Sequence, residues 1–217
     1  MIRITKSIDI PASLQAEDCN QYDGQDVQKQ LHDDQNGKCY LCEQETIHNF
    51  QIEHFRAHAR PEFAHLKFTW TNLFLVCPYC NRQKSDDFDI LDPLLTNIED
   101  IICHQILLDQ RKVAIKSLHP QRIEETQTTT LLNYIFNGRN EIRSYKSELL
   151  YNDMEREVLF FLEILSNYKE DKTQQNKQVV VDSLKINKEY LAFKYWQLKD
   201  LPELFQEFKD ELIWCKE

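Results

Sequence analysis

Four cysteines, arranged as two C-x-x-C pairs, are the residues whose type and spacing point most directly to a chemistry. Cys39 and Cys42 form the first pair, and Cys77 and Cys80 form the second. Two thiolate pairs presented from two turns can close a tetrahedral zinc site with no open coordination position, and such a site is structural. The alternatives are four unrelated buried thiols, or a redox motif, which the absence of a surrounding βαβ pattern disfavours.

A set of polar residues lies between and just after the cysteine pairs, and each has a use in hydrolysing a phosphodiester bond. Glu53 and the side-chain amide of Asn81 offer oxygen ligands to a hard divalent cation. A neutral His54 can take a proton from water near pH 7. Asn72 can hold that imidazole in one tautomer, whereas Asn81 has a helix cap as its alternative role.

A small excess of basic residues falls on the same segment. The chain has 217 residues and a formal net charge of −10, which by itself argues against a nucleic-acid partner. Residues 51–84 nevertheless hold five Lys and Arg residues against two acidic residues. Arg82 and Lys84 follow the second cysteine pair directly, and we expect both to contact substrate phosphate groups.

These residues can meet only if short elements carry them to one place. Residues 51–56 alternate in polarity and suit a strand, and the run LFLVC at 73–77 reads as a buried strand. Residues 78–90 suit a turn into a short helix. A hairpin that carries the acid and the histidine, followed by a helix that carries the second asparagine, would turn all three toward one cation.

The flanking sequence predicts further elements around this unit. A short extended arm leads to a helix near 23–35, and Asn36-Gly37 signals a turn before the first cysteine pair. The β-rich runs 101–108 and 113–118 are joined by a polar turn and predict a hairpin.

The C-terminal half is predicted to be helical from about residue 121, because apolar residues recur there at helical spacing. The charged stretch 169–177 predicts a linker. Residues 178–217 predict two helices divided at Pro202.

Composition bounds the class of protein. Hydrophobic residues make up 41% and charged residues 29%, which is ordinary for a folded soluble chain, and three glycines favour a helix-rich fold. No apolar run is long enough to span a bilayer, and the first residues lack the apolar core of a signal peptide. We therefore expect a cytoplasmic protein, in which seven cysteines favour metal binding over disulfides.

The segments IEH, WTNL and CPYCNRQK together resemble an HNH endonuclease of the ββα-metal type, in the subgroup whose fold is stabilised by a four-cysteine zinc knuckle. The resemblance implies that His54 is the general base and that Glu53, where aspartate is more usual, is a metal ligand. Asn72 matches the middle position. Asn81 stands where a histidine ligand is usual, and an all-oxygen pair favours Mg²⁺ or Mn²⁺ over catalytic zinc.

A narrower resemblance covers the chain opening together with the segments IEHFRAHARP, WTNLFLVCPYCN and DILDP. These are similar to the PtuB nucleases of Septu-type and retron-associated anti-phage defence systems. The resemblance implies an antiviral role with a PtuA-type ATPase as partner, and a retron reverse transcriptase with its RNA and DNA as a further candidate partner. The substrate, DNA or an RNA such as tRNA, stays open.

The expected fold is therefore α+β, with a ββα-metal HNH module, a β-hairpin and a helical C-terminal region. We expect four segments: an N-terminal arm at 1–35, the nuclease module with its zinc knuckle at 36–93, the hairpin at 94–120, and a helical, candidate partner-binding region at 121–217. One competing hypothesis is a non-catalytic zinc-knuckle module that binds nucleic acid or protein. Another is an HNH enzyme of the restriction or homing type that acts alone.

Overall fold

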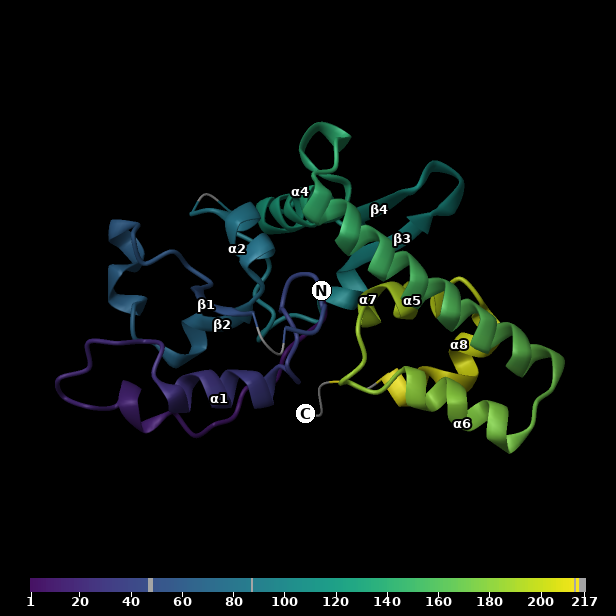
Figure 1. Ribbon diagram of the computed structural model, residues 1–217, viewed down its shortest axis with the longest axis horizontal. Helices are drawn as coiled ribbons and strands as arrows, with labels where there is room; N and C mark the ends of the chain where they lie inside the picture. The colour runs from purple at the N-terminus through teal and green to yellow at the C-terminus, as the bar shows by residue number, and fades with distance from the viewer. Residues whose placement is uncertain (47–48, 87, 213, 215–217) are drawn as a thin grey trace.

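The computed structural model describes residues 1–46, 49–86, 88–212 and 214, and it has a mixed α+β fold. A small ββα unit with helix α1 lies at one end of the molecule, helices α6 and α8 lie at the other, and α7 lies between them beside β3 (Figure 1). The long helix α5 runs from the neighbourhood of α4 towards that second end. The site residues predicted from sequence are therefore concentrated at one end of an elongated chain.

Two short antiparallel strands and one helix form the ββα unit, as expected. Strand β1 (Gln51–His54) pairs with β2 (Leu73–Val76), with Glu53 opposite Phe74. All four residues of β2 are buried, which agrees with the apolar run in the sequence. Helix α2 (Pro78–Lys84) follows directly and begins with a proline in its first turn, where the missing N–H costs nothing.

Helix α1 (Gln25–Asp34) packs against this hairpin and leads into the first cysteine pair. Val27 and Leu31, four residues apart on one helix face, are fully buried in a cluster with Trp70. The predicted Asn-Gly turn follows, and both Asn36 and Gly37 have positive φ angles there. Such angles are inexpensive for these two residue types, so the local sequence itself sets this turn.

The predicted second hairpin is present. Strand β3 (Ile102–Leu107) pairs antiparallel with β4 (Lys112–Ser117), after a single helical turn, α3 (Ile98–Ile101). Helix α4 (Ile123–Asn137) packs on β4, where the side chain of Asn137 bonds both the N–H and the carbonyl of Val113.

The remaining helices are α5 (Tyr145–Glu170), α6 (Gln174–Ser183), α7 (Leu191–Lys199) and α8 (Pro202–Phe208). The expected linker at 169–177 is wrong, because only 171–173 separate α5 from α6. The expectation of two helices after residue 178 is also wrong, since α6, α7 and α8 occupy that region, although α8 does begin at Pro202. Among the described residues, no helix combines the length and apolar character that a membrane crossing needs.

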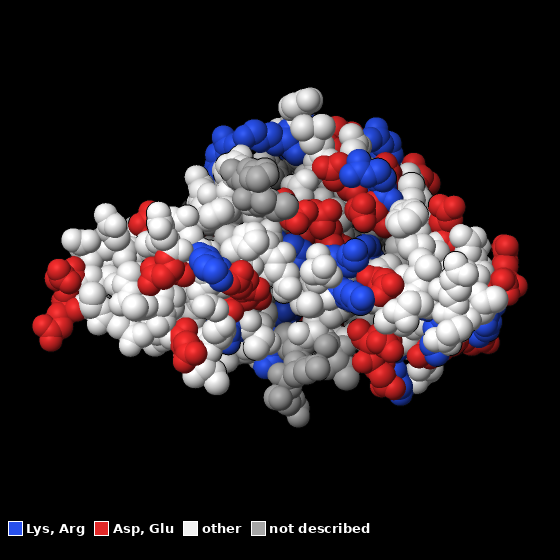
Figure 2. Space-filling view, turned by 60° about the horizontal axis from the view of Figure 1, so that its bottom comes forward, with Lys and Arg blue, Asp and Glu red and all other residues white. Residues whose placement is uncertain are grey.

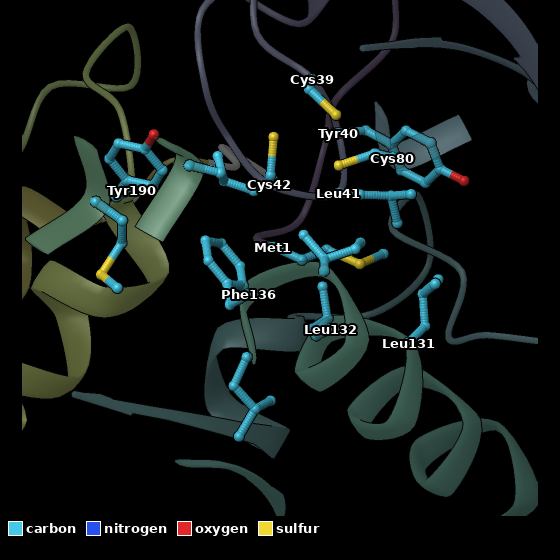
Figure 3. Packing of buried hydrophobic residues seen from close by; sticks show 14 of the residues in the cluster. Met1, Cys39, Tyr40, Leu41, Cys42, Cys80, Leu131, Leu132, Phe136 and Tyr190 are labelled. Carbon is cyan, nitrogen blue, oxygen red and sulfur yellow. The ribbon is translucent and has the colours of Figure 1, made fainter. Parts of the chain in front are cut away.

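One hydrophobic cluster joins the cysteine pairs to the helical region. Figure 3 shows Met1 and Leu41 between the first cysteine pair and Leu131, Leu132 and Phe136 of α4, all of which belong to this cluster. The same cluster includes residues from β3, β4, α5 and α7. The first cysteine pair and Cys80 are almost completely inaccessible to water, and Cys77 is 9% exposed. The ββα unit therefore shares a core with α4, α5 and α7, whereas α6 and α8 pack in a second cluster against the later part of α5.

Candidate active site and metal centre

The four predicted cysteines converge on one point. Their sulfur atoms all lie within 4.8 Å of one another, and all four residues are buried. A tetrahedral zinc ion with Zn–S bonds near 2.3 Å requires sulfur separations of about 3.8 Å. Four thiols and no other metal-binding side chain make up this group. The donor set and its spacing therefore fit a closed zinc site with no position left for substrate.

Two turns present these thiols. In the first, the backbone N–H of Cys39 donates to Gln44 and that of Glu43 donates to Cys39, each at 2.9 Å. In the second, Cys77 caps helix α2, and its sulfur accepts the N–H of Cys80 at 3.4 Å. Cys77 is therefore the N-cap of α2, the alternative role that the sequence suggested for Asn81.

Two side chains of helix α2, one helical turn apart, contact side chains of strand β1. The side-chain amide of Asn81 donates to Gln51 Oε1 at 2.7 Å, and Lys84 Nζ lies 2.7 Å from Glu53 Oε1. Residues 81 and 84 share one helix face, and residues 51 and 53 share one strand face. The structure thus brings Glu53 and Asn81 to the same helix–strand interface.

Glu53 is held through one of its two carboxylate oxygens. Its Oε1 accepts the hydroxyl of Tyr40 at 2.7 Å and contacts the Lys84 ammonium, while Oε2 accepts no hydrogen bond from the described residues. Burial raises the pKa of the Glu53 carboxyl, and the Lys84 ammonium opposes that rise. One oxygen is therefore fixed by neighbours, which leaves the other as the candidate cation ligand.

Lys84 does not occupy the position expected of a phosphate contact. Its side chain is about 3% exposed, and besides pairing with Glu53 it donates to the backbone carbonyls of His54 and Phe55. The ammonium has three N–H donors, and these three acceptors use all of them, which leaves none for a substrate phosphate. Lys84 instead positions the carboxylate and the end of β1. Arg82, by contrast, is exposed.

The half-buried imidazole of His54 is fixed through one nitrogen. Its Nε2 lies 2.9 Å from the carbonyl oxygen of Lys67, so Nε2–H donates and Nδ1 keeps a lone pair. Burial lowers the pKa of His54 to about 4, partly opposed by that hydrogen bond. The ring packs edge-on against Tyr22 and His58, with centroids 4.4 and 4.2 Å away. At pH 7 it is a neutral base with a defined tautomer.

Asn72 acts on His54 indirectly. Its Oδ1 accepts the backbone N–H of Arg56 at 2.7 Å, and its Nδ2 donates to the carbonyls of Arg56 and Leu66 at 3.0 and 3.2 Å. No hydrogen bond links Asn72 to His54 within the described part of the chain. The asparagine instead closes the loop that ends at Lys67, whose carbonyl orients the imidazole.

Asn81 lies at the edge of an open hollow of about 560 Å³. Its Nδ2 is engaged by Gln51, so its Oδ1 remains available as an oxygen ligand. Tyr22, which contacts the His54 ring, and Gln51 also line this hollow. The hollow therefore connects the neighbourhood of the candidate base with the candidate ligand on α2.

Residues 39–87 match the family model described as HNH endonuclease. This HNH segment holds all four cysteines, both strands, helix α2 and every site residue predicted from the sequence. No curated protein and no solved structure matches the chain. The family match therefore covers the ββα unit, and it says nothing of residues 88–217.

Three residues that contact the candidate catalytic residues were not predicted from the sequence. Tyr40 lies between the first two cysteines and bonds Glu53, while Tyr22 comes from the polar stretch before α1 and covers His54. Lys67 contributes its backbone carbonyl, so its side-chain type carries no signal. Only Tyr40 had a sequence cue, since its place inside a C-x-x-C pair puts it beside the metal centre.

Proposed function

We propose that this chain is a metal-dependent endonuclease that hydrolyses phosphodiester bonds of a nucleic acid. The observation that carries the proposal is the state of His54, whose Nε2 is tied to the Lys67 carbonyl while its Nδ1 lone pair stays available within a segment matching the HNH endonuclease family. A neutral imidazole held in one tautomer is what a general base for water activation requires.

The proposed mechanism assigns one task to each residue. His54 takes a proton from the attacking water at Nδ1, and Asn72 keeps the intervening loop closed so that the Lys67 carbonyl orients the ring. Glu53, through Oε2, and Asn81, through Oδ1, would hold a divalent cation such as Mg²⁺ or Mn²⁺. When bound, that cation would stabilise negative charge on the scissile phosphate and leaving oxygen.

Removing the base tests this assignment. We expect His54→Ala to lower cleavage of plasmid DNA or total RNA by about 10²- to 10⁴-fold while zinc content and circular dichroism stay unchanged. His65→Ala is a matched control, because His65 is an exposed histidine of the same loop region. Reactions run with Mg²⁺, Mn²⁺ or EDTA establish the metal requirement. Full activity in a clean His54→Ala preparation would refute the assignment.

We further propose an anti-phage role in which the chain acts with a PtuA-type ATPase, as the sequence resemblance implies. The net charge of −10 supports dependence on a partner, because a chain that repels phosphate overall gains substrate affinity from a second, more basic surface. Co-purification with the products of neighbouring genes, followed by a nuclease assay on DNA and tRNA, tests this role. Cleavage as fast without the partner as with it would contradict this dependence.

A further inference from the structure

A second hollow, of about 320 Å³, lies between the end of α2 and the turn that joins α4 to α5. Arg82 and Gln83 line it from α2, and Tyr134 and Arg139 line it from the helical region. None of the described residues around this hollow is acidic. It therefore places two guanidinium groups, distant in sequence, around one space.

The backbone of the α4–α5 turn fixes the position of Arg139. Gly138 ends α4 with a φ angle of +79°, and a Cβ at this position would lie 2.0 Å from the carbonyl oxygen of Ile142. Only glycine permits this conformation. Arg143 also ties the turn down, because its guanidinium donates to the Phe136 carbonyl and stacks 3.7 Å over Tyr151. Arg139 therefore projects from a constrained turn.

The pairing of arginines distinguishes this hollow from the rest of the surface. Across the described chain, Arg82 and Arg139 have no carboxylate within ion-pair distance, and Arg139 instead stacks on the ring of Tyr134 at 5.4 Å. Arg3 also lacks an acidic partner among the described residues, but its guanidinium donates to the side chain of Asn97. The other six arginines pair with acids: Arg56, Arg60, Arg111, Arg122, Arg143 and Arg156. In a chain with ten excess negative charges, two guanidinium groups that have no acidic partner among the described residues and that line one hollow mark a site for an anion.

We infer that this hollow binds a phosphate of the nucleic-acid strand whose cleavage is proposed above, so the inference rests on the proposed function. Asn81 and Arg82 are neighbours on α2, so the hollow beside Asn81 and the hollow beside Arg82 lie on adjacent faces of this one short helix. Guanidinium groups match phosphate geometry through paired N–H donors. Contacts of this type fix the register of a strand and are indifferent to base sequence. The helical region thereby supplies part of the substrate track.

The inference is tested by binding in a background that cannot cut. Binding to the His54→Ala protein would be measured by fluorescence anisotropy between 50 and 200 mM KCl. The labelled ligands would be duplex DNA, single-stranded DNA and RNA with strands of about 24 nucleotides. We expect Arg82→Ala and Arg139→Ala each to weaken binding roughly tenfold and to reduce the slope of log K against log salt by about 1. Arg82→Lys keeps the charge and should keep the slope.

Arg156→Ala is the matched control, because it removes the same charge from an exposed position on α5. If Arg82→Ala and Arg139→Ala bind like Arg156→Ala while the unmodified chain binds or cleaves nucleic acid, the phosphate site is refuted and the proposed function stands. If neither the unmodified chain nor its complex with a co-purified partner binds or cleaves any of the three substrates, the proposed function fails together with this site.

Discussion

At the scale of single residues, the HNH segment contains two kinds of residue: candidate catalytic or metal-binding residues, and residues that position them. Glu53 and Asn81 each have one polar atom engaged by a neighbour and one oxygen that remains available. His54 follows the same scheme, with Nε2 engaged and Nδ1 available. Lys84, which the sequence suggested as a phosphate contact, positions other groups instead. Asn72, which the sequence suggested as a direct partner of the His54 ring, acts on it through the intervening loop. Fixing one atom of a group orients its other atom without adding a contact at the reacting centre.

The buried Glu53–Lys84 pair gives a prediction that separates support from substrate contact. Lys84→Met leaves a carboxylate buried without its ammonium, and we expect a loss of about 3–5 kcal/mol in the free energy of unfolding. The double variant Glu53→Gln, Lys84→Met removes both charges and should recover most of that loss without recovering cleavage. Urea unfolding measures both effects. A Lys84→Met protein with native stability but weaker, less salt-dependent substrate binding would instead favour a phosphate contact.

At the scale of elements, local sequence predicted most of the structure between α1 and the end of β4. The two strands, the Asn-Gly turn, the second hairpin and the helix after the second cysteine pair all follow from patterns within about ten residues. The α5–α6 boundary did not follow, because its charged residues are paired over long range. Lys172 and Lys177 both lie within ion-pair distance of Glu207 on α8, and the Thr173 side chain caps α6.

Local sequence patterns do not report long-range contacts, and this also explains which features of the site could be predicted. Convergence of four cysteines follows from their types and spacing, because few other arrangements satisfy two C-x-x-C pairs. The placement of Lys84 did not follow, since a lysine near a polar turn has the same local pattern whether it is solvated or enclosed. Tyr22 reaches His54 across more than thirty positions, a distance over which no periodic pattern extends.

Strand β3 carries a buried histidine whose titration should affect stability. His104 donates from Nδ1 to the Ile102 carbonyl at 2.9 Å, and its Nε2 faces the Met1 ammonium at 3.3 Å. The ammonium is itself paired with Glu43, and Phe193 packs on the ring. Burial, followed by the charge of that ammonium, lowers the pKa of His104 well below 6.5.

Because the unfolded chain protonates this histidine near pH 6.5 and the folded chain does not, folding stability should fall as the pH drops below 6.5. The His104 contribution to this slope is at most about 1.4 kcal/mol per pH unit. His104→Gln can keep both hydrogen bonds but cannot titrate, so its stability should fall less between pH 7.5 and 5.5. Urea unfolding at both pH values provides the comparison. Parallel losses in the two proteins would contradict this account.

At the scale of the whole molecule, surface charges act over a shorter distance than the packed core extends. The face drawn in Figure 2 carries acidic and basic side chains interspersed, with Lys and Arg side chains gathered near its centre. Screening confines the influence of such charges to about 10 Å at ordinary salt concentrations. Packing is not confined in this way, because one cluster of buried residues extends from the cysteine pairs through α4 and α5 to α7.

That shared core predicts how the protein responds to losing zinc. Structural zinc sites contribute about 10–16 kcal/mol of apparent binding free energy, which is comparable with the 5–15 kcal/mol that keeps a typical domain folded. Because Cys39 and Cys42 belong to the same buried cluster as residues of α4, α5 and α7, we expect Cys39→Ser or strong chelation to unfold these helices together with the HNH segment. Far-UV circular dichroism should then lose most of its helical signal in one transition. Cys103→Ser, a buried thiol outside the metal cluster, should leave that signal intact. A zinc-free protein that lost only the ββα unit and kept its helices would show that the core is divided between two independently stable parts.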